Sequence, residues 1–141
     1  MRTVVLIVLS FLAVSAEASS LDLTNWVRAY PDQRFFNAPE IKKPLKKMLT
    51  PDQWKRLTET YSVMSQIQLI QDNLVAECCM PHDCPGENAM LVIDLKRMRF
   101  YVGFYDYHQQ KTTIVWISSE GEFYDLPKAV QDEFYYEHNA R

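Results

Sequence analysis

The segment AMLVIDLKRMRFYVGFY, residues 89–105, decides the fold. Residues 89–95 are nearly continuously apolar, which is typical of a strand that is buried on both faces of a sheet. Lys96 and Arg97 then predict a turn, and from residue 98 the side chains alternate as in a second strand. One face of that strand is expected to be core, and it carries Met98, Phe100, Val102 and Phe104. The other face is expected to be half-polar, and it carries Arg99, Tyr101, Gly103 and Tyr105.

Further strands are predicted on both sides of this segment. Residues 66–70 and 74–78 alternate with a period of two, and the polar residues 71–73 between them suit a turn. Residues 112–118 form another run rich in β-branched side chains. Together with the two strands of the central segment, these runs predict an antiparallel sheet of about five strands.

The residues before the strands repeat with a helical period. Residues 23–30 predict a short amphipathic helix that ends before Pro31, and residues 41–49 predict a second helix. Between these helices, residues 32–40 are expected to form a connecting loop. Thr50 is expected to start a third helix, because it stands in the right position for a capping box.

A last helix is predicted to open at Asp125, Leu126 and Pro127, with Val130 and Phe134 facing inward. The expected fold is therefore an α+β domain, in which N-terminal helices and this C-terminal helix flank the antiparallel sheet.

The N-terminus has the pattern of a signal peptide. A charged start is followed by a short apolar run and by Ala16-Glu17-Ala18, which suits a signal peptidase. The run is well short of the roughly 20 residues that cross a bilayer. We expect cleavage after Ala18, so that residues 1–18 are removed and residues 19–141 form a single exported domain.

The charge balance excludes one class of function. The chain has a formal net charge of −3, and removal of residues 1–18 would take away Arg2 and Glu17 together and leave that charge unchanged. Nucleic-acid-binding domains are typically basic. The composition therefore argues against a nucleic-acid partner.

Three cysteines, Cys78, Cys79 and Cys84, lie close together. Thiols of exported proteins tend to form disulfides, and three cysteines allow three pairings. A bridge between the neighbours Cys78 and Cys79 would be strained, whereas residues five or six apart can meet across a turn. We prefer Cys79–Cys84, with Cys78 free and buried on a strand.

The preferred bridge closes the loop Cys79-Met80-Pro81-His82-Asp83-Cys84 between two predicted strands. In the loop-entropy model, so short a ring stabilises the fold by only roughly 2 kcal/mol, so its main effect is to stiffen the loop. A stiff protruding loop loses little entropy when it binds. The ring therefore predicts a preformed binding loop that presents His82.

The pattern C-x-P-H-D-C resembles the inhibitor of vertebrate lysozyme (Ivy) family. It is matched by Cys79, Pro81, His82, Asp83 and Cys84, and the resemblance covers roughly residues 60–120. Met80 stands where some family members have a basic residue, and Cys78 is an additional thiol. The resemblance implies a periplasmic inhibitor that pushes this loop, with His82, into the active-site cleft of a C-type lysozyme.

The chemistry of His82 suits that role. Lysozyme works with one carboxylic acid and one carboxylate, and it is the standard example of such a pair. An imidazole has two nitrogens that point in different directions, so one histidine can hydrogen-bond to both groups. Asp83, Glu77 and Glu87 make the surroundings acidic, which would favour approach to a basic enzyme.

Enzymatic readings of the same loop are weaker. His82 and Asp83 could act together as a general base or as a metal-binding pair, but His-Asp dipeptides are common and no serine or cysteine nucleophile has a recognisable setting. A zinc site of Cys79, His82 and Cys84 would be cramped and would need a fourth ligand. We therefore expect no enzyme activity, no metal site and no cofactor.

The sequence is compatible with two alternatives to lysozyme inhibition. Bacterial lytic transglycosylases also cleave peptidoglycan with a catalytic carboxylic acid, so the loop could restrain the cell's own enzymes. The scaffold could also be a non-inhibitory binding protein of the cell envelope. The sequence alone does not choose among these functions.

Overall fold

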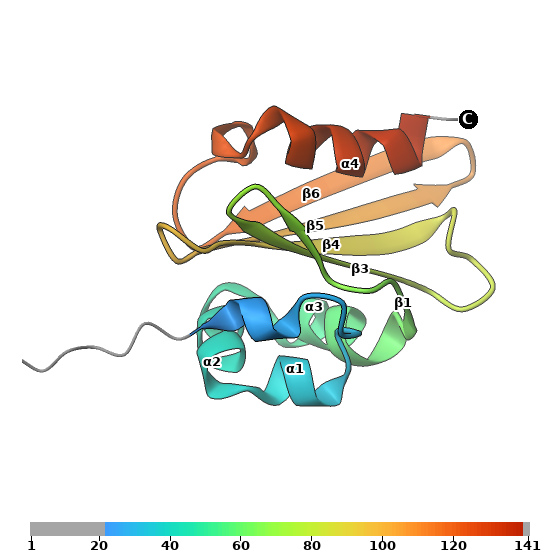
Figure 1. Cartoon of the computed structure of the whole chain (residues 1–141). Helices are drawn as coiled ribbons and strands as arrows, with labels where there is room; N and C mark the ends of the chain where they lie inside the picture. Colours follow the sequence, from blue (N-terminus) through green and yellow to red (C-terminus); the bar gives the residue numbers. More distant parts are fainter. Residues whose placement is uncertain (1–21, 140–141) are drawn as a thin grey trace, which may run out of the picture.

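Helices cover both faces of one antiparallel sheet (Figure 1). The computed structural model describes residues 22–139, with side chains placed up to Phe134. Within these residues, helices α1 to α3 lie on one face of the sheet and α4 lies on the other. The predicted α+β class is confirmed, whereas the predicted signal peptide, residues 1–18, lies outside the described residues.

Within the described residues the sheet has six strands in the order β1-β3-β4-β5-β6, and β2 also pairs with β3. All pairs are antiparallel. The strands are β1 (Val63–Met64), β2 (Gln68–Ile70), β3 (Asn73–Cys79), β4 (Glu87–Asp94), β5 (Arg99–His108) and β6 (Lys111–Ser118). The β3–β4 hairpin places the end of β3 beside the start of β4 at one edge of the molecule.

The helical elements come before and after the strands. They are η1 (Leu23–Trp26), α1 (Gln33–Asn37), α2 (Pro39–Met48), α3 (Pro51–Lys55), η2 (Arg56–Thr60), η3 (Phe123–Asp125) and α4 (Lys128–Asn139). The capping box predicted at Thr50 is present, because Thr50 Oγ1 accepts from the Gln53 backbone N–H and Gln53 Oε1 accepts from the Thr50 backbone N–H. The last helix begins as predicted, with Val130 and Phe134 buried.

Strand β4 is buried on both faces, as its apolar run predicts. Leu91 and Ile93 pack in the core under α1 to α3, while Met90 and Val92 pack in a second core under α4. Two hydrophobic cores therefore share the same central strands.

The prediction that one face of β5 is half-polar was wrong for the two tyrosines on that face. Tyr101 and Tyr105 are buried in the second core, at 1% and 4% exposure. The reason is α4, which packs over this face with Val130 and Phe134. Alternation within one strand does not reveal that a helix from the end of the chain covers its second face.

The front of the chain departs from the prediction in two places. The helix expected over residues 23–30 is only the 3₁₀ helix η1, and Tyr30 is exposed. The expected loop over residues 32–40 instead contains α1 and the start of α2. Asp32 caps α1 by accepting from the backbone N–H groups of Arg34 and Phe35. An aspartate before two buried phenylalanines is the helix signal that the prediction missed.

The strand predicted over residues 66–70 is present only over residues 68–70. Pairing with β3 occurs at β1 and again at β2, and Ile67 between them turns into the core. The backbone of Ile67 pairs with the N-terminal segment instead, through Arg28 N to Ile67 O at 2.8 Å and Ile67 N to Ala29 O at 2.8 Å. A pairing between segments so far apart in the sequence cannot be predicted from the residues around Ile67 alone.

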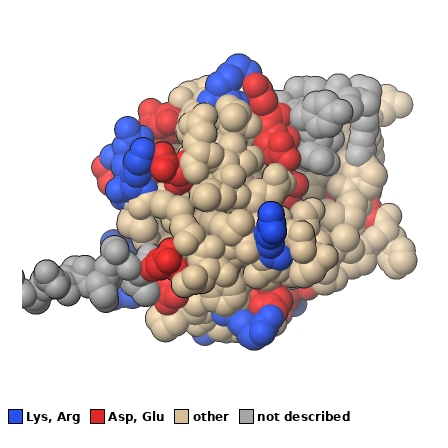
Figure 2. Space-filling model, viewed as in Figure 1, with Lys and Arg blue, Asp and Glu red and all other residues tan. Residues whose placement is uncertain are grey.

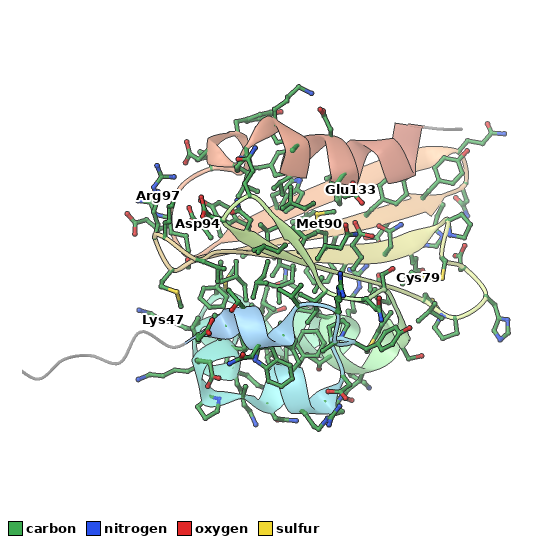
Figure 3. All side chains as sticks on the ribbon, viewed as in Figure 1. Lys47, Cys79, Met90, Asp94, Arg97 and Glu133 are labelled. Atoms are coloured by element: carbon green, nitrogen blue, oxygen red, sulfur yellow. A yellow bond between two sulfur atoms is a disulfide. The ribbon has the colours of Figure 1, made fainter. Side chains whose placement is uncertain are left out.

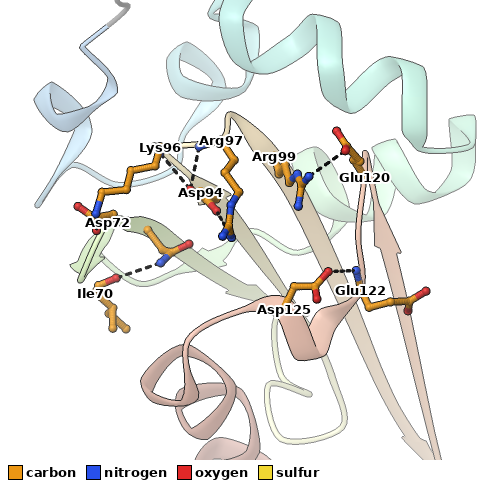
Figure 4. Close-up of polar contacts among 10 residues, drawn as sticks. Ile70, Asp72, Asp94, Lys96, Arg97, Arg99, Glu120, Glu122 and Asp125 are labelled. Atoms are coloured by element: carbon orange, nitrogen blue, oxygen red, sulfur yellow. Dashed lines mark hydrogen bonds and ion pairs between the residues drawn. The ribbon is translucent and has the colours of Figure 1, made fainter.

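The predicted turn between β4 and β5 is held by Asp94 (Figure 4). One carboxylate oxygen of Asp94 accepts from the backbone N–H groups of Lys96 and Arg97, each at 3.0 Å. Met98, predicted to face the core, lies in this turn with φ +51° and is 43% exposed. Met98 is therefore a turn residue, not a core residue.

On the face that Figure 2 shows, Lys and Arg groups are interspersed with Asp and Glu groups, so this face is neither uniformly basic nor uniformly acidic. No helix among residues 22–139 is long and apolar enough to span a bilayer.

Candidate functional site

The loop between β3 and β4 lies at the end of the sheet opposite to the Asp94 turn (Figure 3). It contains all six residues that the sequence assigns to target binding: Cys79, Met80, Pro81, His82, Asp83 and Cys84. Figure 1 shows it extending past the neighbouring helices at that edge. The sheet thus holds the loop by two strand ends and leaves its tip free.

A disulfide joins Cys79 and Cys84, whose Cα atoms are 4.7 Å apart. This is the pairing that the sequence favours, and Cys78 is left as a free, buried thiol. Both ring sulfurs are consumed by the bridge, so they cannot act as thiolate ligands. The rival zinc site of Cys79, His82 and Cys84 is therefore incompatible with this structure.

Backbone hydrogen bonds fold residues 80–86 into two consecutive turns. The Asp83 N–H donates to Met80 O at 3.0 Å, and the Gly86 N–H donates to Asp83 O at 2.9 Å. At the base, the Met80 N–H donates to Glu87 O at 2.9 Å and continues the β3–β4 ladder. The loop is therefore constrained by the disulfide and by its own backbone.

His82 occupies the turn with φ +69° and is exposed. Its side chain makes no hydrogen bond or ion pair with any described residue. A left-handed backbone costs a non-glycine residue roughly 1 kcal/mol, so the ring holds His82 in a conformation that a free chain would seldom adopt. Both nitrogens of the imidazole are free to meet a partner.

Asp83 lies differently from His82. Its carboxylate folds back over Gly86, so closely that a Cβ atom at position 86 would come within 2.3 Å of Asp83 Oδ1. Only glycine leaves room for this arrangement. Asp83 is partly buried at the root of the loop, and it is placed beside Glu87 and His108.

A polar network that the sequence reasoning missed lies beneath the loop root. His108 Nε2 is 2.8 Å from Glu87 Oε1, and Tyr61 Oη donates to Glu87 Oε2 at 3.3 Å. Arg56 joins the network by donating to both Tyr61 Oη and Asp106 Oδ1. The network links η2, β4 and β5, and so it fixes the strand ends that carry the loop.

Strand register explains the network. Glu87 and Asp106 are direct partners across β4 and β5, and two carboxylates in that position repel each other. Arg56 supplies the compensating cation, and it is partly buried, with its guanidinium over the Phe104 ring. The sequence could have revealed this cluster only if the register of the two strands had been known.

Burial raises the pKa of Tyr61 well above its ordinary value, although the hydrogen bond from Arg56 works in the opposite direction. Tyr61 therefore keeps its proton at physiological pH and remains able to donate to Glu87. The orientation of Glu87 is thus fixed by a neutral donor.

The model of one protein family, described as "Inhibitor of vertebrate lysozyme (Ivy)", matches residues 40–138. The matched range begins in α2 and includes the whole sheet, the loop and nearly all of α4. No curated protein and no solved structure matches the chain.

Proposed function

Since the match covers most of its length, the chain belongs to the inhibitor of vertebrate lysozyme family, and on this premise we propose that it blocks C-type lysozyme with the Cys79–Cys84 loop. Lysozyme inhibition in general follows from the family. The finer proposal is that the loop enters the active-site cleft and that His82 is the residue inserted.

The observation that carries this proposal is the setting of His82. It is exposed at the tip of a disulfide-closed ring, and its side chain has no hydrogen bond or ion pair with a described residue that would have to be broken on binding. A side chain held in this way loses little conformational entropy in a complex. The two imidazole nitrogens can bind the acid and the carboxylate of a glycosidase together.

The surroundings of the loop support the choice of a basic target. Glu87 and Asp83 lie at the loop root. Carboxylates near a binding loop raise the rate of encounter with a positively charged partner, and salt weakens this effect. We expect the association rate to fall as ionic strength rises.

The proposed site of action is the periplasm, because lysozyme that enters a bacterium acts on peptidoglycan there. The predicted leader, residues 1–18, would deliver the protein to that compartment and would allow the disulfide to form. The mass of the exported protein tests this part directly, since cleavage after Ala18 would leave residues 19–141.

The central experiment measures lysis of a cell-wall suspension by a C-type lysozyme in the presence of the exported, oxidised protein. We expect wild type to inhibit and His82→Ala to lose at least about 3 kcal/mol of affinity, or about 100-fold, because two hydrogen bonds to charged groups are removed. Lys96→Ala is the matched control, since Lys96 is an exposed residue in the opposite turn.

The outcomes of these assays distinguish the possible targets and test the role of His82. Full lysozyme activity at saturating wild-type protein would end the host-lysozyme proposal. A lytic transglycosylase assayed in parallel would then show whether the loop acts on the cell's own enzymes. Equal inhibition by wild type and His82→Ala would instead place the contact elsewhere on the protein.

A further inference from the structure

We propose that Asp83, Glu87 and His108 form a binding site for a divalent transition-metal ion of the zinc class at the root of the loop. The three residues come from the loop, from the start of β4 and from the end of β5. One potential ligand atom of each lies within 4.8 Å of those of the other two. The proposed ligands include neither the disulfide sulfurs nor His82.

The distances fit a small ion after minor movement. Ligand atoms about 2.1 Å from a tetrahedral zinc ion are roughly 3.4 Å apart from one another. His108 Nε2 and Glu87 Oε1 are now 2.8 Å apart and would separate slightly, and no pair among the three ligand atoms is more than 4.8 Å apart. The His108 side chain is 55% exposed, so it can rotate to make the adjustment and solvent can reach the site.

Both carboxylates have capacity to bind an ion, and that of Glu87 is also oriented by a neighbour. Gly86 leaves the space in which the Asp83 carboxylate lies, and no described residue donates a hydrogen bond to that carboxylate. Glu87 is oriented through its other oxygen by Tyr61, which is itself buried. Hydrogen bonds of this kind commonly orient the ligands of metal sites.

The donor set selects the type of ion. One imidazole and two carboxylates suit Zn²⁺, which accepts three protein ligands and a water molecule, and the two negative charges balance the ion. Ca²⁺ requires six or more oxygen ligands and Mg²⁺ a nearly octahedral set, and three residues with one nitrogen do not supply either.

Bound zinc would connect the loop to the sheet. Asp83 belongs to the ring that carries His82, whereas Glu87 and His108 belong to paired strands. The ion would therefore restrict movement of the loop relative to its root and alter inhibition. This last consequence, unlike the site itself, rests on the proposed function.

Calorimetric titration of the chelator-treated protein with Zn²⁺ tests the site. We expect one ion per wild-type chain, binding weakened more than about tenfold in His108→Ala and in Glu87→Gln, and no comparable binding of Ca²⁺ or Mg²⁺. His82→Ala is the matched control, because His82 is an exposed histidine of the same loop, and it should bind zinc as wild type does. Circular dichroism verifies that each variant is folded.

Lack of zinc binding by the folded wild type would overturn the proposal. So would an equal loss of binding in His82→Ala and His108→Ala, because the ion would then be bound adventitiously by surface histidines. Inhibition measured with zinc and with chelator tests the connection to the loop: the two should differ for wild type and agree for His108→Ala. A wild type that binds zinc but never inhibits would refute the proposed function and leave the metal site standing.

Discussion

Cys78 and Cys79 are neighbours in β3, and the sheet gives their sulfurs opposite surroundings. Cys79 is tied to Cys84 at the loop, while Cys78 points into the core under the helices, with Sγ 3.6 Å from Leu57 O. Burial raises the pKa of the Cys78 thiol to about 12. A protonated, buried thiol is a poor nucleophile, so Cys78 does not exchange with the adjacent disulfide in the folded protein.

The raised pKa of Cys78 predicts loss of stability at alkaline pH. The thiol ionises near pH 9 in the unfolded chain but only near pH 12 in the folded protein, so its contribution is complete below pH 9 and is lost as pH rises from 9 towards 12. The free energy of unfolding should fall by up to about 1.4 kcal/mol per pH unit in that interval. Urea titrations at pH 7, 9 and 10 without oxygen measure this slope. Cys78→Ala should reduce it, and an unchanged slope in that variant would contradict the assignment.

Gly103 gives a second prediction at the scale of one residue. A Cβ atom at this position would come within 2.7 Å of the Trp116 ring, which is stacked on Phe123 at 4.1 Å. Gly103→Ala should therefore destabilise the protein by roughly 1–3 kcal/mol in urea unfolding. The same change in a Trp116→Phe background should cost less, because the smaller ring leaves room. Equal costs in the two backgrounds would show that the ring contact is not the cause.

Among the elements, the hairpin between β5 and β6 has a two-residue turn whose residues seldom adopt the backbone conformation that the turn requires. Gln109 and Gln110 have φ values of +51° and +62°, and His108 pairs directly with Lys111. Two positive φ values in a two-residue loop are typical of a type I′ turn, which favours Asn-Gly. The strand pairing, not the turn sequence, therefore determines this hairpin.

Replacing Gln109-Gln110 with Asn-Gly should stabilise the protein by about 1 kcal/mol, because the left-handed conformation becomes less costly. Thermal unfolding measures the gain. The matched control places Asn-Gly at residues 112–113 within β6, where loss of β-branched side chains should destabilise the strand. A loss of stability in the turn variant would show that the glutamine side chains make necessary contacts.

Elements with a local signal could be predicted from the sequence, and elements that depend on distant contacts could not. The capping box at Thr50 and the apolar run of β4 are local, and both were predicted. The loop was recognised because its ring and its histidine lie in one short motif. His108 was missed as a neighbour of Asp83, since only the register of β4 with β5 brings the end of β5 to the loop root.

At the scale of the whole molecule, the two cores depend on each other. The core under α1 to α3 contains Phe35, and the core under α4 contains Phe134, each about 1% exposed. The shared strands β3, β4 and β5 contribute alternate side chains to both cores. Loss of either layer would expose one apolar face of the sheet on which the loop is mounted.

This arrangement predicts one cooperative unfolding transition. Phe35→Ala and Phe134→Ala, on opposite faces of the sheet, should each cost about 3–5 kcal/mol, a large part of the stability of a domain of this size. In each variant, tryptophan fluorescence and far-ultraviolet circular dichroism should give the same midpoint, because neither layer remains folded without the shared strands. Separate midpoints in Phe134→Ala would mean that α4 detaches alone. The loop would then keep its strand ends and its inhibitory activity after the second core had opened.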